Sequence, residues 1–406
     1  QDTSSAASDV YKRQSQYDPN TSYLDPESKD RFDVDMSGNY AGIGARLQKK
    51  IDKVEITEVI SGGPAWRDNI LEKGDAILKV RQDNEDEPVG ILNMRLSEAV
   101  KLIKGKKGTK VHLTVKKVDG TVTEVTVKRD IVLLEETYIK SSIVEKDNNT
   151  YGLINIPKFY IDFDNQSNRD AAKDLRTEIE RLKEQGIQGL VIDLRNNGGG
   201  ALKTVVDMAG MFIKNGPVVQ VKYFDKEKQV LSDRDRSVLW TGPLVILVNE
   251  GSASASEILA AAMQDYKRAI IIGGNQTWGK GTVQNVFPLN RMVRGNTNGD
   301  LGALRYTTQK YYRINGGSVQ LEGVKSDINV PYRYKYLEFG EKDSENPLQW
   351  DEIDKVEFDT WNSNFNFEEA ITKSNKRMAD NKYLKLVDEN AKWIKSVRDN
   401  KLINLN

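Results

Sequence analysis

Two short apolar runs constrain the fold of this chain more than any other feature. Residues 189–194 and 244–248 are dominated by Leu, Val and Ile, and each leads through a turn of small residues into a helix-like segment. Strands that are apolar on both faces are typical of parallel sheets covered by helices. The helices are expected over about 202–213 and from about Ser254 onward. The pattern therefore predicts an α/β fold.

The same strand–helix alternation extends to both sides of these runs. We expect a strand over 151–156, a helix over 167–185 with Asp170 near its start, and a strand over 270–272. Loops that follow parallel strands and open into helix N-termini are where α/β folds place their chemistry. Residues 131–335 are predicted to form this core, and residues 17–35 are assigned to the same region.

A different pattern precedes the core. Residues 36–130 contain short alternating runs, a hairpin turn at Asp119-Gly120, and one short helix over 97–103 with Ser97 as its N-cap. This composition predicts a small, mostly β module.

The two ends of the chain differ from both domains. Residues 336–406 are charged, rich in Asn and Lys, and carry helical runs such as 382–397, which predicts a helical C-terminal extension. Residues 1–16 are polar and without periodicity, so we treat them as a disordered or artefactual tail.

Charge and composition exclude several classes of function. Lys plus Arg and Asp plus Glu both number 60, so the basic excess of a nucleic-acid binder is missing. The chain has no cysteine and a single histidine, His112, in an alternating strand-like run. A hydrolase here must therefore work without a thiol, a Ser-His-Asp triad or a His-rich metal site. No cofactor or metal is expected, and no run approaches the ~20 apolar residues of a membrane span.

Residues 251–265 are the first candidate for chemistry. Gly251-Ser-Ala-Ser254-Ala255-Ser-Glu257 places small residues between an apolar strand and a helix. A serine at that position lies at the positive end of the helix dipole, beside free amide donors that can stabilise an oxyanion. The alternative is structural, because Ser254 and Glu257 also have the spacing of a capping box, and capping serines greatly outnumber nucleophiles.

The second candidate is Lys280, which stands between Gly279 and Gly281. A lysine that serves as a base near pH 7 must lose about three pKa units, ~4 kcal/mol, which burial without a carboxylate partner can supply. Gln284 lies four residues further on and can orient the amine without charging it. The alternative is a surface lysine in a turn.

The third candidate is a glycine-rich turn, Asn196-Asn197-Gly198-Gly199-Gly200, directly after the strand that ends at Leu194. Its backbone amides can supply part of an oxyanion hole or bind a phosphate. It is not a P-loop, because no Gly-Lys-Ser/Thr closes it. A tight strand-to-helix turn is the plain alternative.

A fourth feature lies in the β-rich module. Gly42-Ile43-Gly44-Ala45 can direct backbone N–H groups at a carboxylate, since glycine tolerates the dihedral angles this needs. Ser61-Gly-Gly-Pro-Ala65 and Leu71-Glu-Lys-Gly-Asp-Ala-Ile-Leu78 follow it. This set resembles a PDZ domain of the bacterial protease type, which adds a substrate C-terminus as an extra strand.

Together these segments resemble the carboxy-terminal processing, or tail-specific, proteases of the long periplasmic type, peptidase family S41. The matching segments cover nearly the whole chain after residue 17 and include 18–24, 193–200, 252–265, 279–284, 311–318 and 336–341. The resemblance implies a crotonase/ClpP-like α/β protease core with an inserted PDZ domain. It also implies a chain truncated at its front and at its back. The segment before the lysine, 274–278, is one residue longer than in many members, and Gly198 stands where relatives often have Pro.

The resemblance implies roles for individual residues. Ser254 corresponds to the nucleophile, Lys280 to the general base and Gln284 to the residue that orients it. Asp265 matches an acidic position implicated in activity. The amides of Ala255 and of Gly199 or Gly200 correspond to the oxyanion hole, and Gly42, Ile43, Gly44 and Ala45 to the tail-binding loop.

The implied function is a Ser–Lys serine endopeptidase of the periplasm that recognises apolar C-terminal tails and hydrolyses envelope proteins. Its implied partners are protein substrates and an envelope adaptor lipoprotein. One alternative is a catalytically silent PDZ module that binds tails without cutting them. A second is a crotonase-like acyl-CoA enzyme, against which the PDZ module argues.

Overall fold

The computed structural model describes residues 16–400, apart from 52, 163–168, 224, 294, 298, 338 and 363–364. The chain forms two compact units. Residues 37–137 make up the smaller one, and the larger one combines the segments on either side, up to Met36 and from Tyr138. The predicted tail, apart from residue 16, and residues 167 and 168 of the helix expected over 167–185 lie outside the described residues.

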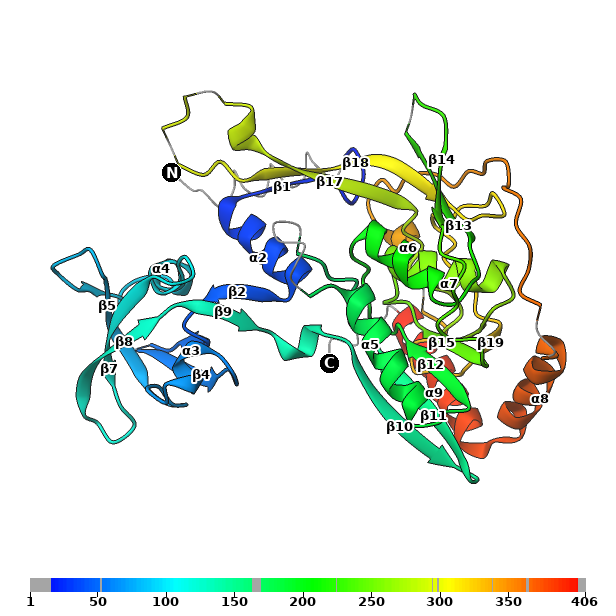
Figure 1. Ribbon diagram of the computed structural model, residues 1–406, viewed down its shortest axis with the longest axis horizontal. Coiled ribbons are helices and arrows are strands. Elements are labelled where there is room, and N and C mark those ends of the chain that lie inside the picture. Colours follow the sequence, from blue (N-terminus) through cyan, green and yellow to red (C-terminus); the bar gives the residue numbers. More distant parts are fainter. Residues whose placement is uncertain are drawn as a thin grey trace. The chain divides into compact units, whose positions relative to one another are not determined.

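The larger unit is built on a six-stranded mixed sheet (Figure 1). Its strand order is β10-β11-β12-β15-β16-β19, and only the edge pair β10–β11 is antiparallel. The strands span Lys140–Lys146, Asn149–Asn155, Gly189–Asp193, Leu244–Val248, Ile270–Gly273 and Ile328–Asn329. The apolar runs of the sequence are therefore the central parallel strands, as predicted.

Three helices follow these strands. They are α5 (Ala171–Glu184), α6 (Leu202–Gly210) and α7 (Ala255–Asp265). Asp170 caps α5 as expected, since its carboxylate accepts a hydrogen bond from the Lys173 N–H at 2.9 Å. Helix α7 is buried from Ala255 to Met263, and its small side chains allow close packing on every side.

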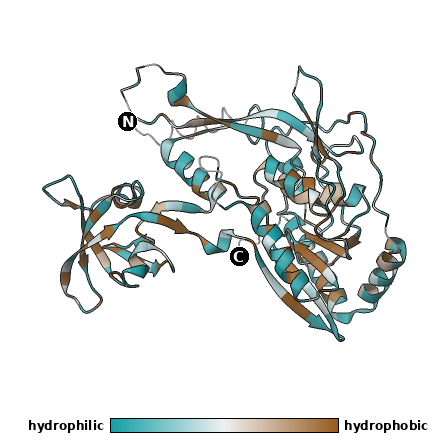
Figure 2. Cartoon of the chain, viewed as in Figure 1, coloured by the Kyte–Doolittle hydropathy of each residue, from teal (hydrophilic) through white to brown (hydrophobic). Residues whose placement is uncertain are grey.

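A second sheet contacts the other side of α6 and α7 through β13 and β14. It consists of β1 (Ser22–Leu24), β13 (Gly216–Tyr223), β14 (Gln229–Asp233), β17 (Thr282–Pro288) and β18 (Ala303–Tyr312), which all pair antiparallel. One continuous apolar core therefore joins the two sheets and the helices. Figure 2 shows hydrophobic residues on the strands, whereas the visible faces of the outer helices are largely hydrophilic.

Further helices flank this core. Helix α2 (Pro26–Ser37) precedes the smaller unit, and α8 (Phe367–Asp380) and α9 (Lys382–Asp399) form the C-terminal region. The predicted extension is helical only from Phe367, apart from a short 3-10 turn at Glu341–Asp343. The Asp388 carboxylate of helix α9 forms an ion pair with Lys335 Nζ at 2.7 Å, which connects the helix to the rest of the larger unit.

The smaller unit has its own core and is mostly β. Strands β3 (Ala45–Lys49), β4 (Val54–Val59), β5 (Ala76–Gln82), β7 (Lys110–Lys116) and β8 (Val122–Lys128) form its sheet, and β6 (Val89–Gly90) pairs with β5. Helices α3 (Pro64–Arg67) and α4 (Leu96–Ile103) complete it, and β2 (Asn39–Gly42) pairs with β9 (Asp130–Leu133).

The N-cap prediction for α4 was wrong. The helix begins at Leu96 with Arg95 as N-cap, and the Glu98 carboxylate accepts the Arg95 N–H at 3.1 Å, so Ser97 lies inside the first turn. We attribute this start to Glu98, whose carboxylate caps the helix three positions after Arg95.

Candidate active site

Ser254 lies where the chain turns sharply from β15 into α7. Its φ of 56° and ψ of −113° are unusual for a residue with a side chain. Strained backbone of this kind persists only where neighbours fix it, and it concentrates at functional sites. The neighbours are present here, since Ala253 N–H donates to the Asn197 carbonyl at 3.0 Å and Ser252 Oγ donates to the Leu194 carbonyl at 2.8 Å.

The glycine-rich turn after β12 packs directly against Ser254. A Cβ built on Gly199 would lie 2.8 Å from the Ser254 Cβ and 3.2 Å from the Ala255 nitrogen. Gly199 has φ of 107°, which also favours glycine. Only a residue without a side chain therefore lets this turn approach the start of α7 so closely.

The two glycine amides of this turn are not equivalent. The Gly199 N–H donates to Asn197 Oδ1 at 2.9 Å, and the Asn197 amide in turn donates to the Ile156 carbonyl at 2.7 Å. Gly200 instead lies beside Phe159, and its N–H makes no hydrogen bond within the described part of the chain. Of the two, Gly200 is the amide that remains available to a ligand.

Lys280 lies between β16 and β17, in a loop that residues 318–321 approach closely. A Cβ on Gly279 would lie 2.9 Å from the Leu321 backbone, and one on Gly281 would lie 2.9 Å from Gln320. Burial, and to a smaller extent the positive charge of Arg305, lower the pKa of Lys280 to about 8. The carboxylates of Glu341, Glu257 and Asp18 act in the opposite direction. The lysine thus has the lowered pKa that a base requires.

Glu257 joins the serine and lysine segments. Its carboxylate accepts hydrogen bonds from the Ser254 N–H at 2.7 Å, the Gly279 N–H at 2.7 Å and the Lys280 N–H at 3.0 Å. Thr277 Oγ1 donates to the same carboxylate at 2.6 Å. The side chain is fully buried, which raises its pKa to about 7, whereas the four donors favour the charged form. The capping box expected from the sequence therefore describes only part of the role of Glu257, which also binds the loop of Lys280.

Tyr311, on β18, provides a second connection between the same two segments. Its single hydroxyl proton is shared, in a bifurcated hydrogen bond, between the Lys280 carbonyl oxygen at 2.6 Å and the Ser254 carbonyl oxygen at 3.1 Å. The residue is fully buried, and burial together with the nearby Glu257 carboxylate raises its pKa. The sequence offered only a weak signal for it, a Tyr-Tyr-Arg run at the end of a strand.

Residues from both ends of the chain complete the surroundings of Lys280. Glu341 is buried, and its carboxylate accepts from Asn20 Nδ2 at 2.7 Å and from Trp278 Nε1 at 2.9 Å. Asp18 accepts from Thr307 Oγ1 at 2.9 Å and from Thr21 Oγ1 at 2.5 Å. Sequence reasoning missed these partners because their separation along the chain hides the contact.

The side chains of two predicted site residues, Gln284 and Asp265, bind groups other than Ser254 and Lys280. The Gln284 amide donates to Thr282 Oγ1 at 2.9 Å and to Thr307 Oγ1 at 3.2 Å, and neither bond reaches Lys280. Asp265 ends α7, ten residues from Ala255 and therefore ~15 Å along the helix. There it forms a two-pronged ion pair with Arg313 at 2.6 and 3.1 Å. Burial raises the pKa of Asp265, and Arg313 opposes this shift.

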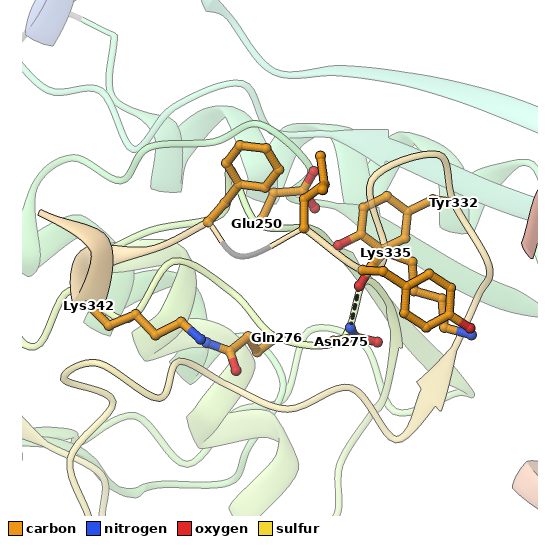
Figure 3. A pocket seen from close by; sticks show the side chains of 9 residues that line it. Glu250, Asn275, Gln276, Tyr332, Lys335 and Lys342 are labelled. Atoms are coloured by element: carbon orange, nitrogen blue, oxygen red, sulfur yellow. Dashed lines mark hydrogen bonds between the residues drawn. The ribbon is translucent and has the colours of Figure 1, made fainter. Parts of the chain in front are cut away.

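A polar pocket of about 180 Å³ borders the segments that lead to Ser254 and Lys280 (Figure 3). Glu250 lies in the turn after β15, and Asn275 and Gln276 come from the loop before Lys280. The other wall consists of Tyr332, Lys335, Tyr336, Leu337, Phe339 and Lys342. The Asn275 amide donates to the Lys335 carbonyl at 2.9 Å across it. The C-terminal region thus contributes directly to the surroundings of the loop.

The predicted tail-binding loop connects β2 with β3 in the smaller unit. Ile43 is buried, and its carbonyl accepts from the Ala65 N–H at 2.9 Å. Gly44 has φ of 80°, and its carbonyl accepts from the Ile60 N–H at 2.8 Å. The loop is therefore fixed through its carbonyl groups by the backbone N–H groups of Ile60 and Ala65.

No group of three or more His, Asp and Glu side chains within the described ranges has the arrangement of a metal site. No helix in these ranges is both long and apolar enough to cross a membrane.

Comparison with known families supports the resemblance seen in the sequence. Residues 150–330 match peptidase family S41, residues 32–116 match the PDZ domain, and residues 334–406 match the C-terminal domain of tail specific protease (DUF3340). The chain thus contains a peptidase S41 domain, a PDZ domain and a C-terminal domain of tail specific protease. It combines this mixed α/β protease fold with a PDZ domain and a helical C-terminal segment.

Two curated relatives are similar over most of the chain. A tail-specific protease of Haemophilus influenzae is 39% identical over 96% of this chain and 55% of its own length. A carboxy-terminal processing protease of Bacillus subtilis is 33% identical over 78% of this chain and 62% of its own length. The chain therefore spans roughly half to three fifths of the relatives it matches.

A solved structure of a PDZ domain is similar to part of the chain. It is the PDZ domain of a carboxy-terminal protease from Vibrio cholerae in complex with a peptide, 41% identical, with a TM-score of 0.22. The match covers 23% of this chain and 97% of that one.

Proposed function

We propose that this chain is a serine endopeptidase in which Ser254 attacks the peptide bond and Lys280 acts as general base. The observation that carries the proposal is that a strained serine at the start of α7 and a lysine whose pKa is lowered to about 8 lie in segments bound by the same two side chains. Glu257 and Tyr311 hold both segments by hydrogen bonds.

The proposed reaction is acyl transfer. The neutral Lys280 amine takes the proton of Ser254 Oγ as this oxygen bonds to the substrate carbonyl carbon. The protonated amine then donates to the leaving peptide nitrogen, the C–N bond breaks, and Ser254 carries the acyl group. Water, deprotonated by the same amine, hydrolyses the ester and restores the serine.

The developing oxyanion needs two donors. The Ala255 N–H lies at the start of α7, where the helix dipole favours negative charge. Gly200 is the better second donor, because the Gly199 N–H already donates to Asn197. Gln284 is proposed to act on Lys280 only through Thr282 and Thr307, or after a change of rotamer.

Asp265 is proposed to act as a positioning residue. Its ion pair with Arg313 fixes the chain just after Tyr311, two residues away on the same segment. Loss of the pair would move the Tyr311 hydroxyl away from the two carbonyls that it joins.

The proposed substrates are proteins with apolar C-terminal tails, which the Gly42–Ala45 loop would capture by strand addition. The named peptide complex of the similar Vibrio cholerae domain and the names of the curated relatives support this part. A periplasmic location, envelope protein substrates and an envelope adaptor lipoprotein are proposed from the family resemblance.

The test is incubation of the chain with an unfolded protein that ends in an apolar tail, followed by mass spectrometry. Ser254→Ala and Lys280→Ala should abolish cleavage, and Lys203→Ala on the exposed face of α6 serves as control. Full cleavage by Ser254→Ala would disprove the nucleophile. Binding without cleavage by the parent chain would favour a catalytically silent tail-binding module.

A further inference from the structure

A second pocket, of about 310 Å³, lies at the opposite end of β15 from Ser254. Leu244 and Val245, at the start of the strand, line it, together with Trp361 and Phe367 from the C-terminal region. Ser254 follows the other end of the same strand, so the pocket is separate from the candidate active site. Its walls are mainly apolar, and a single charged residue, Arg268, lines it.

Arg268 is a buried charge without a counter-ion. The residue is only 3% exposed, and no carboxylate within the described residues pairs with it. Buried ions are normally paired, because removal of a charge from water is costly. Burial alone lowers the pKa of Arg268 to about 10, which still leaves the guanidinium positive at neutral pH.

The hydrogen bonds of Arg268 are incomplete. Nε donates to the Phe212 carbonyl at 2.9 Å, and Nη2 donates to the carbonyls of Trp240 and Gly242 at 2.6 and 3.0 Å. Nη1 makes no hydrogen bond within the described part of the chain. Two N–H donors of a buried guanidinium are therefore left for a ligand of the pocket.

Arg129 of the smaller unit shows how this chain satisfies an arginine that is only structural. It is 2% exposed and likewise lacks a carboxylate partner, yet all three of its nitrogens donate, with acceptors at 2.7 to 3.0 Å. The hydrogen bonds of Arg129 are therefore complete without a ligand. The difference between the two arginines is that Arg268 lines a pocket and that its Nη1 has no acceptor among the described residues.

The remaining contacts keep the guanidinium in place. Its centre lies 4.7 Å from the Trp361 ring, and Trp361 N–H donates to the Tyr266 carbonyl at 2.7 Å, which holds the ring over the arginine. Three carbonyl acceptors and the Trp361 ring fix its orientation without neutralising its charge. The site is thus rigid before any ligand arrives.

We propose that this pocket binds a carboxylate attached to one apolar group, with Arg268 Nη1 as the donor and Trp361, Phe367 and Val245 as the apolar walls. The C-terminal residue of a polypeptide and a free aryl or alkyl carboxylic acid share this chemistry. The volume matches about one amino-acid residue, at the lower end of the ~300–1,000 Å³ typical of ligand pockets. The proposal concerns binding only and holds whether or not Ser254 is catalytic.

The experiment is isothermal titration calorimetry on the whole chain with Ser254→Ala in the background. The probes are N-acetyl-L-phenylalanine, its amide, and 3-phenylpropionate. The acid should bind, and the uncharged amide should bind at least ~10-fold more weakly, because it cannot pair with the guanidinium. Equal binding of the acid and its amide would overturn the proposal.

Variants locate the binding. Arg268→Gln removes the charge, and Val245→Phe fills the pocket without touching the three carbonyl contacts. Each should weaken the acid at least ~10-fold, whereas Arg291→Gln, at an exposed position, should leave it unchanged. The glycine loop of the PDZ unit can also prefer an acid over its amide, so the variants decide where the acid binds. Unchanged binding of the acid by a folded Val245→Phe variant would overturn the proposal. This test stands even if Arg268→Gln fails to fold.

The third probe separates the two sources of the carboxylate. Stronger binding of N-acetyl-L-phenylalanine than of 3-phenylpropionate supports a polypeptide C-terminus, because only the former carries a peptide group. Equal binding of both supports a site for free carboxylic acids. Failure of both to bind at millimolar concentration would refute the site.

Discussion

The pH dependence of cleavage tests the assignment of Lys280 most directly. Its pKa falls from 10.5 to about 8, a change of roughly 2.5 units or ~3.4 kcal/mol. If the neutral amine is the base, kcat/KM should rise tenfold per pH unit below pH 8 and become constant above it. Roughly a tenth of the plateau is expected at pH 7 and a hundredth at pH 6.

Two charge-removing variants should move this profile in opposite directions. The Arg305 charge lowers the pKa of Lys280 and the Glu341 charge raises it. Arg305→Gln should therefore shift the acid limb upward, and Glu341→Gln should shift it downward, each by about 0.5 to 1 unit for one charge near a half-buried site. Asp207→Asn on the exposed face of α6 provides a matched control without a shift.

Stability provides a second readout of the same pKa. Because the folded value lies below the unfolded one, the unfolded chain binds more protons between pH 8 and pH 10.5, and stability should rise with pH over that window. At pH 7 the charged lysine costs up to ~3 kcal/mol, so Lys280→Met should unfold at a higher temperature while it loses activity. A flat pH–rate profile between pH 6 and 9, together with an unchanged melting temperature for Lys280→Met, would refute the reasoning.

Three further predictions concern the residues that hold the site. Tyr311→Phe should lower kcat/KM by about tenfold, as expected for ~1.5 kcal/mol of lost hydrogen bonding, and an unchanged rate would contradict its role. Glu257→Gln places an amide N–H donor among the four donors that now bind the carboxylate. The free energy of unfolding should therefore fall by ~3 kcal/mol or more, and an unchanged melting temperature would contradict this. Asp265→Asn should destabilise the chain by about 2–4 kcal/mol through Arg313, with partial activity retained below the melting temperature. Complete inactivity of a fully stable Asp265→Asn variant would instead indicate a direct chemical role.

Local patterns predicted the α/β core well. The apolar runs at 189–194 and 244–248 became β12 and β15, and the helix expected from Ser254 begins at Ala255 with Ser254 as its cap. These elements were predictable because burial on both faces leaves a composition that few other structures share.

The second sheet was not predictable from local patterns. Its strands pair across long distances along the chain, as when Ser22 of β1 lies opposite Arg305 of β18. Helix α2 was missed for a different reason, since its sequence is charged and has no clear apolar face.

The residues of the candidate site likewise differ in whether the sequence alone could reveal them. Ser254 and Lys280 belong to short segments of unusual composition, which the sequence reveals. Glu257, Tyr311 and Glu341 are ordinary residues in ordinary patterns, and only the fold gives them a common neighbour in the lysine loop. Partners of this type depend on tertiary contacts that no local signal encodes.

The contact between Asn20 and Glu341 joins residues that are 321 positions apart, and the loop of Lys280 is fixed between them through Trp278. During synthesis the chain emerges from its N-terminus at ~5–20 residues per second, so the serine and the lysine leave the ribosome well before Glu341 does. A lysine in a loop that is not yet enclosed remains hydrated and keeps the ordinary pKa of ~10.4. If Ser254 and Lys280 act as proposed, the nascent chain therefore carries them without a working base, and cleavage is expected only after translation has passed residue 341.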